Sequence, residues 1–104
     1  MNYKHLIESI EARPGFFLRN PNLDELNAFL RGISYINFAQ GNMDQFRDFY
    51  ENWFPRTFPQ CTHDWLTTLR EMARVEDEWK LFFEIWKRYI QENDNKQKKG
   101  NDDI

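Results

Sequence analysis

The chain has 104 residues, with 14 Lys and Arg against 17 Asp and Glu, which gives a formal net charge of -3 and a pI near 5.4. This length suits a single domain, and the acidic balance argues against a nucleic acid partner, because such partners are held by basic residues that neutralise phosphates. Hydrophobic residues make up 40% of the chain, and there is one valine. The sequence therefore predicts a globular, all-α fold of four to five helices.

The first predicted helix covers residues 3–12. Its apolar residues recur at the i, i+3, i+4, i+7 spacing that places them on one face. Arg13-Pro14-Gly15 ends this helix, and the apolar run Phe16-Phe17-Leu18 is too short for another. We expect that run to be an extended strap that tucks two aromatic rings under the bundle.

A second helix is predicted from Leu23 to about Ala39. Asn22 and Glu25 have the spacing of a capping box at its start. Gly32 lies inside this helix at a propensity cost of about 1 kcal/mol, which predicts a close helix crossing there. The predicted buried stripe is Leu26, Phe29, Leu30, Ile33 and Ile36.

The third predicted helix follows the stop signal Gln40-Gly41, with Asn42 as its cap and Gln45 at the box position. One face carries Phe46, Phe49, Tyr50 and Trp53. Phe54-Pro55 is expected to close the helix. Pro55 and Pro59 then predict a rigid loop over residues 55–60, anchored by Phe58.

The remaining apolar residues predict two more helices. Thr62 is the expected cap of the fourth, with Asp64 in its first turn. Residues 75–78 are either a break or the polar middle of one long helix. A break is favoured, because one helix from Asp64 to Asn93 would be ~45 Å long. The two apolar sets are Trp65, Leu66, Leu69 and Met72, then Trp79, Phe82, Phe83, Trp86 and Ile90.

The chain after Gln91 is polar. It predicts a folded domain over residues 1–93 and a frayed C-terminal tail over residues 94–104. The N-terminus leads into no apolar h-region, no apolar run approaches the ~20 residues that span a bilayer, and one cysteine cannot form an internal disulfide. We therefore expect a cytoplasmic protein with no membrane partner.

Cys61-Thr62-His63-Asp64 brings a nucleophile, a base and a carboxylate together and allows an enzyme interpretation. A structural zinc site needs four ligands, and His5 is far away in sequence. Spacing alone does not establish a catalytic pair. We expect Cys61 to pack as a small apolar residue, and we predict no enzymatic activity, metal or cofactor.

The order of motifs resembles a group of small bacterial immunity proteins that accompany polymorphic toxins, including contact-dependent growth inhibition systems. The resemblance spans residues 5–90, and the chain departs from the pattern at Arg19, where glycine is usual, and at Phe17, where tyrosine is common. It implies a cytoplasmic protein that occludes one cognate toxin domain. The motifs are Arg13-Pro14-Gly15-Phe16-Phe17-Leu18, Leu23-x-x-Leu26-x-x-Phe29-Leu30-x-Gly32, Phe46-x-x-Phe49-x-x-x-Trp53, His63-Asp64-Trp65 and Phe82-Phe83-Glu84.

An acidic binding surface would fit such a partner, because many of these toxins are nucleases with basic clefts. Tyr50 is the expected aromatic anchor of this surface. A small helical adaptor or regulatory domain is the alternative function, and an enzyme that uses Cys61 and His63 is the third. The predicted partner-binding residues are Asp44, Asp48, Tyr50, Glu51, Glu76, Asp77 and Glu78.

Overall fold

The computed structural model describes residues 2–60, 64–73 and 77–102, with side chains as far as Asp94, and this part of the chain is helical with no strand. The first helices are α1 (Tyr3–Ala12), the short 3-10 turn η1 (Pro14–Phe16) and α2 (Leu23–Ala39). A continuous helical rod follows, made of α3 (Gln45–Asp48), the π-helical turn η2 (Phe49–Trp53) and α4 (Phe54–Thr57). The last two helices are α5 (Trp65–Ala73) and α6 (Glu78–Asp102). The all-α prediction is confirmed, and so is the division of the C-terminal region into two helices.

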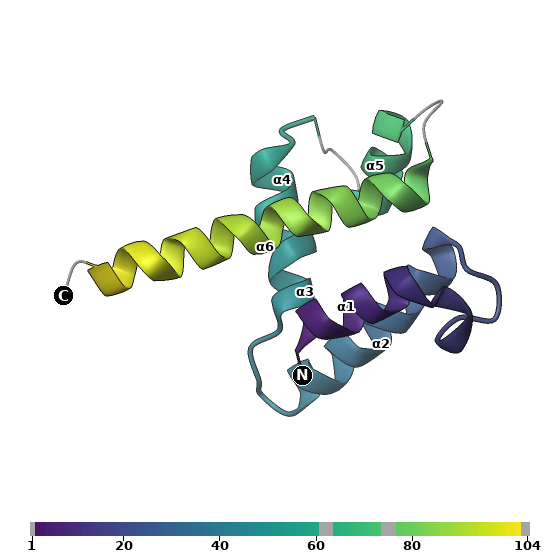
Figure 1. The fold of residues 1–104 in the computed structure, drawn as a ribbon, viewed down its shortest axis with the longest axis horizontal. Coiled ribbons are helices and arrows are strands. Elements are labelled where there is room, and N and C mark those ends of the chain that lie inside the picture. Colours follow the sequence, from purple (N-terminus) through teal and green to yellow (C-terminus); the bar gives the residue numbers. More distant parts are fainter. Residues whose placement is uncertain (1, 61–63, 74–76, 103–104) are drawn as a thin grey trace.

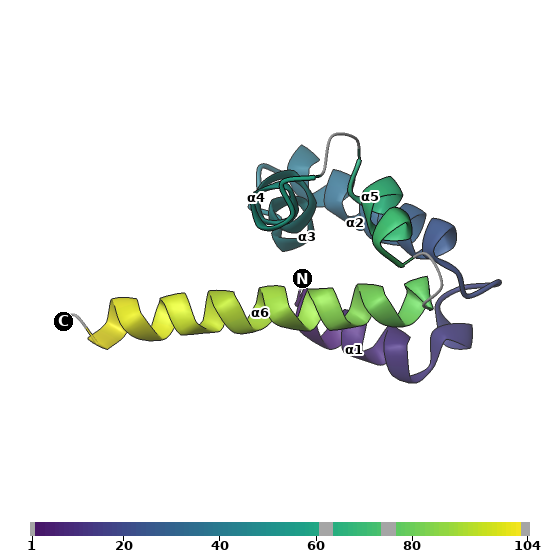
Figure 2. The ribbon, with the colours of Figure 1, turned by 90° about the horizontal axis from the view of Figure 1, so that it is seen from above.

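The helices form two layers. Helix α6 runs along the longest axis and crosses the rod of α3 and α4 (Figure 1). Seen from above, α6 and α1 make one layer, and α2, α3, α4 and α5 make the other (Figure 2). The C-terminal part of α6 extends beyond the other helices in both views. Among the helices described, none is both long enough and apolar enough to cross a bilayer.

Phe49 is at the centre of an aromatic core between the layers. Its side chain is fully buried, and neighbouring rings lie with centroids 5.2 to 6.0 Å away. Aromatic pairs at such distances add to the free energy gained by burying their area. These rings belong to Phe46, Trp53, Phe54, Trp65, Phe82, Trp86 and Tyr89.

The rod does not end at Phe54-Pro55, as the sequence predicts, but continues to Thr57. In a regular α-helix the ring of Pro55 would clash with the carbonyl four residues earlier. Here the backbone N–H of Phe54 bonds to the carbonyl of Phe49 instead, and the wider π-helical turn precedes the proline. The predicted anchor Phe58 is partly buried against the core, where its ring meets those of Trp53 and Phe54.

The helix caps are partly as expected. Asn22 begins α2 by accepting the N–H of Glu25 at 2.9 Å, as predicted. Gly41 follows α2 with a φ of 76°, a conformation that glycine adopts without strain. The cap of α3 is Asp44 rather than Asn42, which lies two residues further from the helix.

The starts of the last two helices also use aspartates. Asp64 precedes α5 and accepts the N–H of Thr67 at 2.7 Å, so it caps the helix rather than lying in its first turn. Asp77 does the same for α6. The predicted cap Thr62 lies outside the described residues.

Three expectations about burial are wrong. Phe16 is 77% exposed, because η1 turns its ring outward, and only Phe17 and Leu18 of the expected strap pack against the core. Ile36 is 57% exposed, since it lies off the stripe that α2 buries. The space beside Gly32 is open, with no atom within 4 Å of where a Cβ would lie, so no helix in the described part of the chain crosses there.

The predicted frayed tail is helical as far as Asp102. No proline interrupts α6, and Lys96, Lys98 and Lys99 lie near its C-terminal end. Whether residues 94–104 are needed for folding stays a prediction.

Candidate protein-binding surface

Asp44 joins three elements at the start of α3. It accepts the phenol O–H of Tyr3 at 2.6 Å, the side-chain amide of Asn37 at 2.8 Å and the backbone N–H of Arg47 at 2.7 Å. Burial alone would raise the pKa of Asp44, but these hydrogen bonds outweigh it and hold the pKa below its usual value. Burial first, and then the bond to Asp44, raise the pKa of Tyr3. Asp44 is therefore ionised and fixed in position near neutral pH.

Asp48 lies one turn further along the rod and connects it to α6. It accepts the phenol O–H of Tyr89 at 2.8 Å and the side-chain amide of Asn52 at 3.0 Å. The same Tyr89 hydroxyl lies 3.1 Å from the carbonyl of Gln45. Burial, followed by the hydrogen bond to Asp48, raises the pKa of Tyr89, so this phenol stays protonated and donates.

The two carboxylates line one pocket of about 280 Å³ between α3 and α6. We call it the acidic pocket. Its other lining residues include Met43, whose side chain is 98% exposed at the end of the loop from α2. The acidic pocket is lined by Met43, Asp44, Gln45, Asp48, Tyr89 and Asn93.

Tyr50 and Glu51 do not line the acidic pocket. Glu51 is exposed and pairs with Arg47 across one helical turn, at 3.1 Å. Tyr50 is partly buried against Phe46 and opens toward α2, where the guanidinium of Arg31 lies 4.8 Å from its ring centroid. The predicted residues of the rod therefore do not form one surface. Asp44 and Asp48 line the acidic pocket, whereas Tyr50 faces α2.

The second predicted acidic group lies at the start of α6. Asp77 is exposed and accepts the backbone N–H groups of Trp79 and Lys80, while Glu78 pairs with Arg70 at 3.3 Å. Arg70 also pairs with Asp24 on α2, at 3.0 Å. Glu76 lies outside the described residues.

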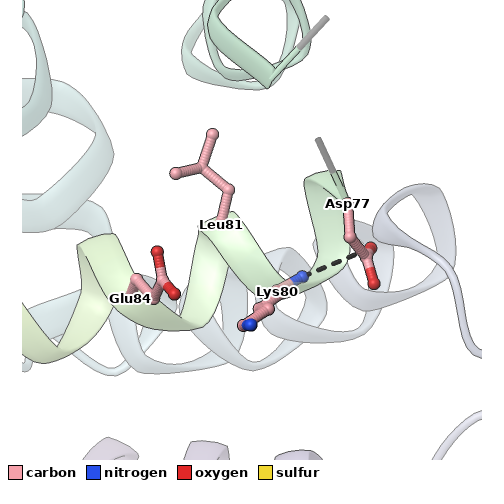
Figure 3. Close-up of a pocket in the computed structure, with 4 residues that line it drawn as sticks. All are labelled: Asp77, Lys80, Leu81 and Glu84. Atoms are coloured by element: carbon pink, nitrogen blue, oxygen red, sulfur yellow. Dashed lines mark hydrogen bonds between the residues drawn. The ribbon is translucent and has the colours of Figure 1, made fainter. Parts of the chain in front are cut away.

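Asp77 lines a separate pocket of about 400 Å³ with Lys80, Leu81 and Glu84. Lys80 and Leu81 point to opposite sides of α6 in this region (Figure 3). Asp77 precedes Tyr89, the partner of Asp48, by twelve positions in the chain, which is roughly 18 Å along a helix. The two predicted acidic groups are therefore two separate patches.

Several exposed residues were not predicted to be functional. The most prominent are Arg31, Tyr35 and Phe38, which line one pocket with Tyr50 and the partly buried Arg47, together with Met43 on the loop. Tyr35 and Phe38 are 72% and 59% exposed. The sequence could have predicted that these two rings are exposed, because neither belongs to the buried stripe of α2.

The enzyme interpretation receives no further support. Cys61 and His63 lie outside the described residues. Within the part of the chain that is described, no three His, Cys, Asp or Glu side chains are grouped so that they could hold a metal ion. The absence of enzymatic activity stays a prediction.

The chain matches no protein-family model, no curated protein and no solved structure.

Proposed function

We propose that this chain is a bacterial immunity protein that binds one cognate toxin domain and neutralises it by covering its active site. The acidic pocket is the observation that carries the proposal, because it presents two fixed carboxylates to an incoming partner. The resemblance in motif order supports the same function. The protein would act in the cytoplasm, in a stoichiometric complex and without turnover.

Asp48, in the acidic pocket, can accept further hydrogen bonds. A carboxylate has about four acceptor positions. Asp48 has two intramolecular donors, whereas Asp44 has four hydrogen-bond partners, in Tyr3, Ser34, Asn37 and Arg47. Both side chains are only partly buried. A Lys or Arg side chain of a partner could therefore bind here without displacing the bonds that hold the fold together.

The position of Met43 suits the same interface. Its side chain is almost completely exposed beside the two carboxylates. Methionine is flexible and polarisable, and it is enriched at protein interfaces. A basic toxin cleft would gain association rate and orientation from the carboxylates, and it would gain buried apolar area from Met43.

Co-expression with a neighbouring gene that encodes a toxin domain tests the proposal. We expect cells that carry both genes to survive, and we expect a one-to-one complex to survive purification. Asp48→Asn keeps an acceptor for Tyr89 but removes the charge, so it should weaken the complex about tenfold, as a charged interface pair does. Glu8→Gln, an exposed charge on α1, is the matched control and should leave the affinity unchanged.

Equal killing with and without this protein, together with no complex, would contradict the immunity function. If the chain instead captured a partner that is not toxic, the adaptor function would be the better explanation. If Asp48→Asn bound the toxin as tightly as the native chain, the acidic pocket would not be part of the interface.

A further inference from the structure

Another pocket lies on the side of the rod opposite the acidic pocket, between α2 and α3. It holds about 120 Å³. We call it the arginine pocket. It combines two guanidinium groups, three aromatic rings, of which two are phenols, and the hydroxyl of Ser34, and none of these residues lines the acidic pocket. Its lining residues are Arg31, Ser34, Tyr35, Phe38, Arg47 and Tyr50.

Both arginines lie over aromatic rings. The guanidinium carbon of Arg47 is 4.3 Å from the ring centroid of Phe38, and that of Arg31 is 4.8 Å from the ring centroid of Tyr50. Stacking covers a flat face of a guanidinium but leaves the N–H groups at its edges available. The edges of the two groups can therefore donate to an acceptor that enters the pocket.

The charges of this pocket are not balanced from within. Arg47 pairs with Glu51 through Nε. Arg31 forms no ion pair with any other residue in the described part of the chain. The lining of the pocket thus holds two cations and no anion, while Glu51 pairs with Arg47 and Asp44 is a hydrogen-bond partner of Ser34. A local positive site of this kind selects an anion.

The size and the rim of the pocket define that anion more closely. Pockets for small-molecule ligands hold roughly 300 Å³ or more, so a cavity of about 120 Å³ suits one side chain. The exposed rings of Tyr35 and Phe38 form an apolar rim. Exposed aromatic residues and arginines are the residue types that dominate protein interfaces energetically.

We infer that the arginine pocket binds a carboxylate side chain, an Asp or Glu of the protein partner that is followed by an apolar residue. The carboxylate accepts from Arg31 and Arg47, and the apolar neighbour covers Tyr35 and Phe38. This inference rests on the proposed function for the identity of the partner. It requires that the partner present a carboxylate on one side of the rod and a cation on the other.

The pocket can be tested without the toxin. The full chain, labelled with ¹⁵N, is titrated by NMR with the capped dipeptide acetyl-Glu-Phe-amide, and with acetyl-Gln-Phe-amide as the uncharged control. We expect the glutamate peptide to shift amides of residues 31–38 and 47–50, with an affinity about fivefold to tenfold higher than that of the glutamine peptide. Arg31→Gln should abolish this preference, while Arg19→Gln, another exposed arginine, should retain it.

Three results would overturn the inference. These are no shifts at the highest soluble peptide concentration, equal binding of the two peptides, and competition by inorganic phosphate at the same concentration as the glutamate peptide. The last result would assign the pocket to phosphate groups instead of a protein carboxylate.

The toxin complex then separates the two proposals. Arg31→Gln should weaken that complex about tenfold. Arg31→Lys should not restore it, because lysine lacks the flat fork that stacks on Tyr50. A pocket that binds the peptide while no toxin complex forms would contradict only the proposed function. A toxin complex that tolerates Arg31→Gln would contradict only this inference.

Discussion

The α3 and η2 part of the rod separates the acidic pocket from the arginine pocket. The two pockets differ in charge and in the contacts that hold their charged side chains. The carboxylates of the acidic pocket are held by hydrogen bonds from α1, α2 and α6. The arginines of the opposite pocket are stacked on rings, and Arg47 has one exposed ion pair with its own helix. Substitutions of the carboxylates should therefore change stability and binding together, whereas substitutions of the two arginines should change binding alone.

This contrast follows from the positions of the residues relative to the core. Asp44 and Asp48 are one helical turn apart and face tyrosines whose rings are fully or almost fully buried. A hydroxyl in such a place needs a partner, because an unsatisfied polar group costs about 1–3 kcal/mol. The acidic residues are thus part of the fold as well as candidates for binding.

Replacement of Phe49 should have the largest effect, because both pockets depend on the rod that this ring anchors. Phe49→Ala should lower the free energy of unfolding by about 3–5 kcal/mol, the range for aromatic-to-alanine changes in a core. Denaturation in urea measures the loss. Phe16→Ala is the control and should change stability by less than ~0.5 kcal/mol, because that ring is exposed. A small loss for Phe49→Ala would contradict the central position of this ring.

Replacement of Asp44 should have the next largest effect and should depend on pH. Asp44→Ala removes a helix cap and leaves the Tyr3 hydroxyl without its acceptor, so it should cost about 1–3 kcal/mol at pH 7. The pKa of Asp44 is lower in the folded state than its ordinary value of 3.8. Its ionised form therefore stabilises the fold above that value, and this stabilisation is lost as the pH falls through the folded pKa.

The measurement is urea denaturation of the native chain and of Asp44→Ala between pH 7 and pH 2.5. The difference in stability between the two should shrink below about pH 4. Glu8→Ala, which removes an exposed carboxylate from α1, is the control and should show no such change. If the difference in stability did not change with pH, the ionised form of Asp44 would not stabilise the fold more than the protonated form does.

The sequence predicts the buried residues well, because burial leaves a periodic pattern. The stripe of α6 and the first helix follow the i, i+3, i+4 rule, and Phe82, Phe83 and Trp86 are buried as expected. The continuation of the rod through Pro55 could not be predicted in this way, since the π-helical turn that permits it has no periodic signal. The cap of α2 was predicted correctly at Asn22. For α3 the sequence offered both Asn42 and Asp44, and the prediction chose the wrong one.

The candidate site was less predictable for a different reason. The acidic residues could be identified from their type, but their separation into two patches depends on the fold. The arginine pocket depends on contacts between α2 and α3, such as that of Arg47 with Phe38. A single sequence gives no information on such contacts between helices. Only Tyr50 was identified in advance as an aromatic anchor, and the structure places it in the arginine pocket rather than the acidic one.

Charge reversal should affect the rate of toxin association. Asp48→Lys should slow association about threefold to tenfold and should weaken its dependence on salt, because charges at an interface act on the encounter more than on dissociation. Asp77→Lys is the matched reversal in the other acidic patch. The two patches are further apart than the Debye length of about 8 Å at physiological salt, so their effects should be additive in the logarithm of the rate.

Stopped-flow mixing at several salt concentrations measures these rates, with Glu8→Lys on α1 as the control. If Asp77→Lys has no effect, only the acidic pocket faces the toxin, and the second patch has a structural role through its capping bonds. If neither reversal slows association while the complex still forms, the acidic surface does not steer binding.

Removal of residues 94–104 should have the smallest effect. The acidic pocket reaches Asn93, and α6 continues beyond it away from the other helices. Before its last residue the removed segment is entirely polar, so a chain that ends at Asn93 should lose less than ~0.5 kcal/mol of stability. Thermal melting followed by circular dichroism measures this, and the affinity for the toxin should also be unchanged.

A markedly lower melting temperature would show that the end of α6 stabilises the fold. Weaker toxin binding at unchanged stability would instead extend the binding surface from the acidic pocket along α6.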